Sequence, residues 1–201
     1  MRCIGKPMRS FGKSKSGTDF LINQKFKQKQ NFATNDPMIN EAESSFFTFC
    51  NVNMTESYQV NQSLDFLNCQ RCVLTYEARR RGYDVTALPT YSTDMMPKNN
   101  DYLRALSNPK VVDIQKSTKK LESQMKSYGN GSRAIIQIRK GRNGHVFIAE
   151  NKNGKVQYID PQTNERYNKV SFKHVSNVSV IRIDNQSFTE YAKNAFTRQK
   201  V

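Results

Sequence analysis

The sequence predicts an α+β fold in which N-terminal helices pack on an antiparallel sheet. Hydrophobic residues first recur with a helical period, from about residue 69, and from about residue 133 they follow the alternation typical of strands. The segments "KGRNG" and "NKNG" separate these strand candidates and are typical of hairpin turns. Helices followed by consecutive hairpins favour an antiparallel sheet with the helices packed against it.

The charge is concentrated at the start of the chain. The 201 residues carry a net charge of +15, and residues 1–30 contribute eight Lys or Arg against one Asp. We therefore expect residues 1–40 to be a basic, flexible arm and residues 41–201 to form one domain. Such an arm is also suited to weak contact with nucleic acid. No apolar run is long enough to span a membrane, and no apolar stretch after the basic N-terminus predicts a signal peptide, so we expect synthesis in the cytoplasm.

The first helix is predicted to begin directly after Asn68 and to end near Gly82. Asparagine is a favoured N-cap because its side-chain oxygen accepts a backbone N–H of the first turn, and glycine commonly ends a helix. Between them, five residues follow helical spacing: Cys69, Cys72, Val73, Tyr76 and Arg80. Cys69 is thus expected in the first turn and Cys72 one turn inside the helix.

The remaining elements follow in order. An extended segment over 83–92 leads to a second helix, which Asn108-Pro109 opens and Gly129 closes. Four strands are expected next, and the segment 187–196 is predicted to be a short closing helix. The expected strands are 133–139, 145–150, 155–160 and 178–184.

The pair Cys69-x-x-Cys72 allows three interpretations. A structural zinc site needs four ligands, and the chain has two His, neither paired with another His or Cys. A redox pair needs a thioredoxin-like βαβ context, whereas the sheet here is expected to be antiparallel. A nucleophile fits better, because a helix N-terminus lowers the pKa of a thiol. We therefore expect no metal and no cofactor.

A cysteine nucleophile requires a base and a group that orients the base. His145 begins one predicted strand and Asp160 ends the next, so a hairpin turned about "NKNG" sets them opposite each other on one face. The alternative is structural: a strand His, an Asp before Pro and a helical Cys are each commonly without catalytic function. His174 has no comparable partner and is expected to be structural or exposed.

The combination of these motifs resembles the papain-fold toxin domains of bacterial polymorphic toxins, of the glutamine deamidase type, which also end some phage minor head proteins. The matching motifs lie within about residues 67–165: an Asn-Cys-x-x-Cys helix start followed by Arg-Gly, then Gly-Ser-Arg, Gly-His and Asp-x-Gln-Thr. Pro161 stands where many relatives have Gly. The resemblance implies a papain-like fold and a Cys69–His145–Asp160 site. Papain itself uses the second Cys of such a pair, so Cys72 is the alternative nucleophile.

The resemblance implies acyl transfer through a thioester on a carboxamide substrate. Asn68 and Gln162 are candidate oxyanion or substrate contacts. Release of ammonia makes the enzyme a deamidase of glutamine in a target protein; a peptide leaving group makes it a protease, and an amine acceptor a transglutaminase. A cognate immunity protein, and delivery to a target cell or in a phage particle, are further expectations. The alternative from another class is a non-catalytic basic module that binds nucleic acid or a phage particle, to which the arm and "EARRRG" would contribute.

Overall fold

The computed structural model describes residues 2–3, 60–90 and 100–198. Its centre is a seven-stranded sheet with the strand order β3-β8-β4-β5-β6-β7, in which all these neighbours are antiparallel. The strands are β3 (Val111–Asp113), β8 (Asn177–Arg182), β4 (Arg133–Lys140), β5 (Asn143–Lys152), β6 (Lys155–Asp160) and β7 (Glu165–Tyr167). The seventh, β1 (Arg2–Cys3), pairs in parallel with the start of β5, so the first residues of the predicted arm contact the sheet. The rest of residues 1–40 lies outside the described residues.

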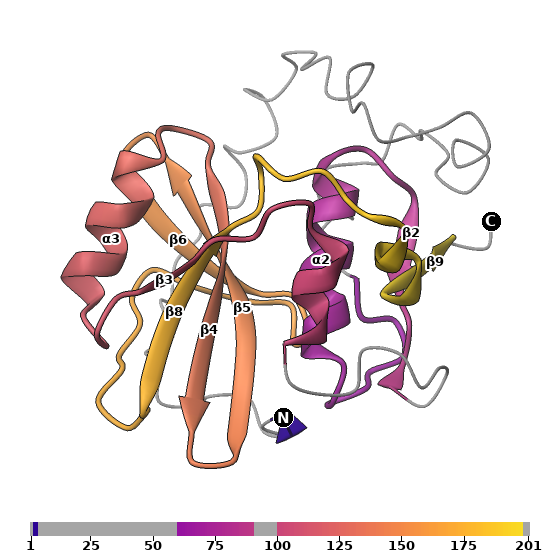
Figure 1. The fold of residues 1–201 in the computed structure, drawn as a ribbon, viewed down its shortest axis with the longest axis horizontal. Helices are drawn as coiled ribbons and strands as arrows, with labels where there is room; N and C mark the ends of the chain where they lie inside the picture. Colours follow the sequence, from indigo (N-terminus) through magenta and orange to yellow (C-terminus); the bar gives the residue numbers. More distant parts are fainter. Residues whose placement is uncertain (1, 4–59, 91–99, 199–201) are drawn as a thin grey trace.

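Two helices pack on opposite faces of this sheet (Figure 1), which confirms the α+β prediction. Helix α2 (Cys69–Arg80) shares a buried apolar cluster with Ile135 and Ile148. Helix α3 (Thr118–Ser127) covers the other cluster, to which Ile136 and Phe147 belong. Neighbouring strand residues thus face opposite helices, as the two-residue period of a strand requires.

A second, two-stranded sheet lies beside α2. It pairs β2 (Val85–Ala87) with β9 (Phe196–Arg198). Two short 3₁₀ helices complete this side, η3 (Asp101–Ala105) and η4 (Glu190–Asn194). The expected closing helix over 187–196 is therefore a single 3₁₀ turn followed by a strand, because Phe196 pairs with β2 and is buried in the core.

The second helix begins later than the sequence predicts. The segment after Pro109 forms β3, an edge strand paired with β8, and the helix starts only at Thr118. Gln115 and Lys116 both have positive φ (52° and 59°), which a helix cannot accommodate. Ser117 then caps the helix, since its side chain accepts a hydrogen bond from Lys120 N.

The β5–β6 hairpin has a register two residues different from the expected one. Its turn is the two-residue Asn153-Gly154, both with positive φ, which closes the hairpin at Lys152 and Lys155. Ile148 pairs with Ile159, so Asp160 lies diagonal to His145 instead of directly opposite it. A shift of two residues keeps every side chain on its predicted face, and the two residues therefore still meet.

Candidate active site

Helix α2 begins where the sequence predicts, but Asn68 caps it differently. The backbone oxygen of Asn68 accepts hydrogen bonds from Arg71 N (2.9 Å) and Cys72 N (3.0 Å), while its side chain caps no backbone N–H. Its Oδ1 instead accepts from the Cys72 thiol (3.3 Å). The expected side-chain cap is therefore wrong, and the amide takes part in tertiary contacts.

His145 and Asp160 form a buried pair. Nε2 of His145 and Oδ2 of Asp160 are 2.7 Å apart, and both residues are buried. Phe147, two residues along β5, stacks near the imidazole with ring centroids 6.3 Å apart. Because Nε2 faces the carboxylate, the imidazole is oriented with Nδ1 as the nitrogen that can exchange a proton with another group.

Hydrogen bonds connect this pair to the start of α2. Oδ1 of Asp160 accepts from Gln162 N (3.0 Å). The side chain of Gln162 in turn donates through Nε2 to Oδ1 of Asn68 (3.3 Å). A continuous path of hydrogen bonds thus runs from His145 through Asp160, Gln162 and Asn68 to Cys72, and all five residues are buried.

Asn61 and Asp65 support this path from the segment before the helix. Nδ2 of Asn68 donates to Oδ1 of Asn61 (2.9 Å) and to the Leu88 oxygen (3.3 Å). Nδ2 of Asn61 donates to the backbone oxygens of Gln162 (2.9 Å) and Asp65 (3.0 Å). Nε2 of Gln162 also donates to the backbone oxygen of Asp65 (3.2 Å). The side-chain N–H groups of Asn68 and Gln162 therefore have protein acceptors.

The two cysteines differ in environment, although neither is in a disulfide. Cys72 is 0% exposed and its thiol is a hydrogen-bond donor to Asn68. Cys69 is 2% exposed and lies close enough to Tyr102 to affect its ionisation. Burial raises the pKa of Tyr102 well above its usual range, and the proximity of Cys69 raises it further. Tyr102 is thus neutral, and its hydroxyl donates to Gln137 (3.2 Å).

Arg71 places a buried guanidinium in the first turn of α2. Its Nη1 donates to the Pro89 oxygen (3.0 Å). Burial lowers its pKa, while Asp65, Tyr191 and Cys72 act in the opposite direction.

The far end of α2 is bound to the sheet by ion pairs. Arg133 donates to Glu77 through Nε (2.6 Å) and Nη2 (2.8 Å), and Arg81 donates through Nε (2.9 Å). Burial alone would raise the pKa of Glu77, but the two guanidinium groups lower it to about 2. Glu150 of β5 accepts from the Tyr76 hydroxyl (2.7 Å) and pairs with Arg80 (3.2 Å). This orients the helix whose start carries Cys69.

The described residues contain no group of three or more His, Cys, Asp or Glu placed to hold a metal ion, and none of their helices is long and apolar enough to cross a membrane.

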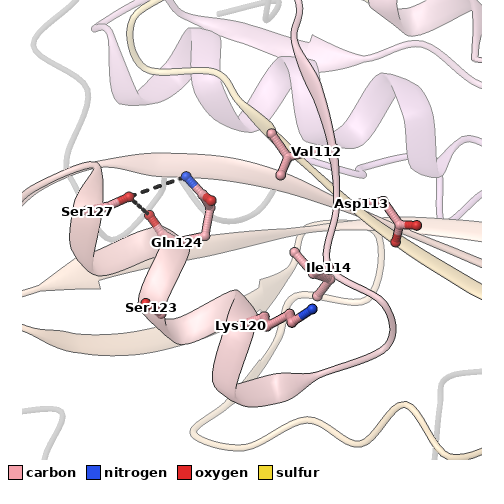
Figure 2. Close-up of a pocket in the computed structure, with 7 residues that line it drawn as sticks. All are labelled: Val112, Asp113, Ile114, Lys120, Ser123, Gln124 and Ser127. Carbon is pink, nitrogen blue, oxygen red and sulfur yellow. Dashed lines mark hydrogen bonds between the residues drawn. The ribbon is translucent and has the colours of Figure 1, made fainter.

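A surface cleft of about 340 Å³ lies between β3 and α3, lined by Val112, Lys120, Gln124 and four others (Figure 2). None of the predicted site residues lines it. His174 is exposed, as expected for a surface residue.

Comparison with known families matches this region. Residues 67–165 match the family model described as papain fold toxin 1, glutamine deamidase. The match supports the resemblance of this region to papain-fold toxin domains of the glutamine deamidase type. No curated protein and no solved structure matches the chain. The matched range begins two residues before Cys69 and ends five residues after Asp160, so it contains every predicted site residue.

Sequence reasoning missed the supporting residues of this site. Asn61 and Asp65 lie just before the matched range, and the only signal was the polar composition of "NQSLD" ahead of the helix. Their contacts to Gln162 cross about a hundred residues of sequence, which no local pattern predicts.

Proposed function

We propose that the domain deamidates glutamine in a protein substrate, with Cys69 as nucleophile, His145 as base and Asp160 as the group that orients the imidazole. The observation that carries this proposal is the buried 2.7 Å contact between His145 and Asp160, joined by hydrogen bonds to the helix that begins at Cys69. The match to glutamine deamidase toxins supports the choice of substrate.

The reaction proceeds through two acyl transfers. The Cys69 thiolate attacks the carboxamide carbon, and the protonated His145 gives its proton to the leaving nitrogen, so that ammonia departs and a thioester remains. His145 then takes a proton from water as the water attacks the thioester, and the sulfur leaves as thiolate. The product side chain is glutamate. Asp160 stabilises the imidazolium that is present before the first proton transfer and forms again in the second.

Cys69 suits the role of nucleophile better than Cys72. The Cys72 thiol donates its proton to an amide oxygen, and a thiolate would lose that hydrogen bond and face the oxygen with a negative charge. Burial does not separate the two, since Cys72 is 0% and Cys69 2% exposed. Cys69 is the first residue of α2, where the positive end of the helix dipole favours a thiolate.

Asn68 and Gln162 are better suited to positioning than to oxyanion binding. Their side-chain N–H groups donate to protein acceptors, which leaves the developing oxyanion to other donors. Backbone N–H groups at the helix start are the alternative donors, other than those of Arg71 and Cys72, which donate to the Asn68 oxygen.

The test is ammonia release from benzyloxycarbonyl-Gln-Gly by the full chain, with mass spectrometry of β-casein treated in parallel. We expect Cys69→Ala and His145→Ala each to lower the rate by at least about a thousandfold. Cys72→Ala is the matched control on the same helix and should retain most of the activity. Loss in Cys72→Ala alone would assign the nucleophile to Cys72, and full activity in the double cysteine variant would exclude the enzyme hypothesis.

The β-casein products separate the three reactions that share this thioester. Glutamate in place of glutamine in an intact chain supports deamidation, cleaved chains support a protease, and incorporation of an added fluorescent amine supports a transglutaminase. We further propose that a cognate immunity protein binds the domain and that the domain is delivered to a target cell or carried in a phage particle. We also propose that the basic arm contacts nucleic acid. A purely nucleic-acid-binding module would show salt-sensitive binding and no ammonia release.

A further inference from the structure

The exposed apolar side chains are concentrated immediately before the catalytic helix. Among the described residues, four large hydrophobic side chains are more than half exposed: Leu64 (73%), Phe66 (57%), Leu67 (52%) and Val111 (52%). Three of them lie within one four-residue segment. We call Leu64, Phe66 and Leu67 the apolar rim. A grouping of this kind on a surface indicates a contact site more strongly than scattered exposed residues do.

The apolar rim is held in its exposed conformation by specific contacts. Leu64 has φ 54°, a left-handed conformation that a leucine adopts only when its surroundings impose it. Leu64 N donates to the Asn61 oxygen (3.3 Å), which closes a turn. The Asp65 carboxylate accepts from Leu67 N (2.8 Å) and from Thr90 N. The exposure is therefore a property of an ordered segment.

The apolar rim is also continuous with the candidate active site. The Asp65 oxygen, in the middle of the segment, accepts from Nε2 of Gln162 (3.2 Å), the residue that contacts Asp160 and Asn68. Leu67 precedes Cys69 by only two positions. A molecule that covers the rim is thus placed beside the start of α2.

We propose that the apolar rim binds apolar side chains that flank the target glutamine in the protein substrate. This inference rests on the proposed function, because it identifies the ligand of the rim with the substrate of Cys69. Apolar flanking residues are the matching chemistry, since the rim offers hydrocarbon surface, and burial of such surface on both partners is what stabilises the contact. A nucleic-acid backbone has no apolar group to bury there.

The experiment measures binding without catalysis. Full-length Cys69→Ala protein is titrated into two fluorescein-labelled peptides that contain one glutamine, flanked by Leu and Phe in one peptide and by Ser in the other. We expect the apolar peptide to bind at least about tenfold more tightly. Adding Leu64→Ser and Phe66→Ser should remove that preference. Adding Val111→Ser, at an exposed apolar residue on β3 outside the rim, should leave it unchanged.

The outcomes distinguish failure of this inference from failure of the proposed function. Ammonia release from benzyloxycarbonyl-Gln-Gly by the unmodified chain tests the function alone. Peptide preference without any ammonia release would overturn the deamidase proposal and leave the rim a binding surface. Ammonia release with equal binding of both peptides, or a preference that survives Leu64→Ser and Phe66→Ser, would overturn the rim proposal. So would dimerisation that the same two substitutions abolish, because the rim would then bind a second copy.

Discussion

The two ends of helix α2 are connected to the rest of the protein by different chemistry. At its start, the contacts to the end of β6 pass through neutral amides, with Asn68 bonded to Gln162. At its end, the contacts to the sheet are ion pairs, in which Glu77 is bound by Arg133 and Arg81. Asn68, Gln162, Glu77 and Arg133 are buried, and Arg81 is half-buried.

This difference shows how one helix serves both stability and chemistry. Buried ion pairs resist removal of either partner, so they fix the helix strongly against the sheet. Placed beside the proposed nucleophile, further charges of this kind would bias the ionisation of thiol and imidazole. The Asn68–Gln162 contact connects the helix start to β6 without adding a charge to the Arg71 guanidinium that already lies in the first turn. The comparison predicts that substitutions at the start change activity most and substitutions at the end change stability most.

The largest effect should come from Asp160→Asn. The variant keeps the size of the side chain but loses the charge that holds the imidazole in its tautomer, so we expect a loss of about 10³- to 10⁴-fold in kcat. The thermal midpoint should change by only a few degrees. Ammonia release and thermal denaturation measure the two quantities. A variant with normal kcat would show that the 2.7 Å contact to His145 is structural.

At the other end of the helix, Glu77→Gln should reduce stability by about 3–5 kcal/mol, because it leaves the buried Arg133 guanidinium and the half-buried Arg81 guanidinium without their carboxylate. The activity of the molecules that remain folded should be preserved. Urea denaturation gives the free energy of unfolding, and Glu190→Gln, at an exposed position in η4, is the control. If activity falls together with stability, the two ends of α2 are not functionally separate.

The lowered pKa of Glu77 also predicts how the free energy of unfolding depends on pH. The pKa of Glu77 is lowered from an ordinary 4.5 to about 2, so the folded state holds the ionised form more strongly than the unfolded state does. Its contribution is present above pH 4.5 and is lost as the pH falls toward 2, about 3 kcal/mol in all. Unfolding free energies measured from pH 6 to pH 2 should fall less steeply in Glu77→Gln than in the unmodified chain. Parallel curves would contradict the assignment.

Local sequence patterns predicted the elements that depend on local chemistry. Helix α2 begins at the expected residue, and β4, β5, β6 and β8 lie within about two residues of their predicted bounds. The strand β3 was missed because its identity depends on pairing with β8, about seventy residues away. The closing segment was misassigned for the same reason, since Phe196 is a strand residue only through its pairing with Ala87.

The candidate site likewise has one part that local sequence predicts and another that depends on long-range contacts. The hairpin turn places His145 and Asp160 on one face, and the period of two preserves that result despite the error in register. The support from Asn61 and Asp65, and the pairing of Glu77 with Arg133, join segments that only the fold brings together. Sequence patterns therefore predicted that His145 and Asp160 share a face, and missed the residues that hold the helix start and the end of β6 in place.

Gln162→Leu tests the amide path at the start of the helix. The substitution removes one of the two donors to Asn68 Oδ1 and one of the two donors to the Asp65 backbone oxygen, and each hydrogen bond lost costs about 0.5–1.5 kcal/mol. We expect slightly lower stability together with a moderate fall in kcat, because the helix start loses its side-chain contact to the residue whose backbone N–H binds Asp160. A large fall in kcat at unchanged stability would instead support the oxyanion role for Gln162.

The smallest expected effect concerns Gln70, the residue after Cys69. Its side chain is buried, and its Oε1 has no hydrogen-bond partner among the described residues. A buried carbonyl without a donor destabilises the folded state, so Gln70→Met, which keeps the volume and removes that oxygen, should raise stability by about 1 kcal/mol. Urea denaturation and ammonia release should be measured on the same preparation. If stability rises while kcat/KM falls, Gln70 Oε1 accepts an N–H of the substrate carboxamide, and Gln70 joins Cys69, His145 and Asp160 in the proposed site. If stability and kcat/KM are both unchanged, Oε1 is solvated in the folded protein and Gln70 has no part in the site.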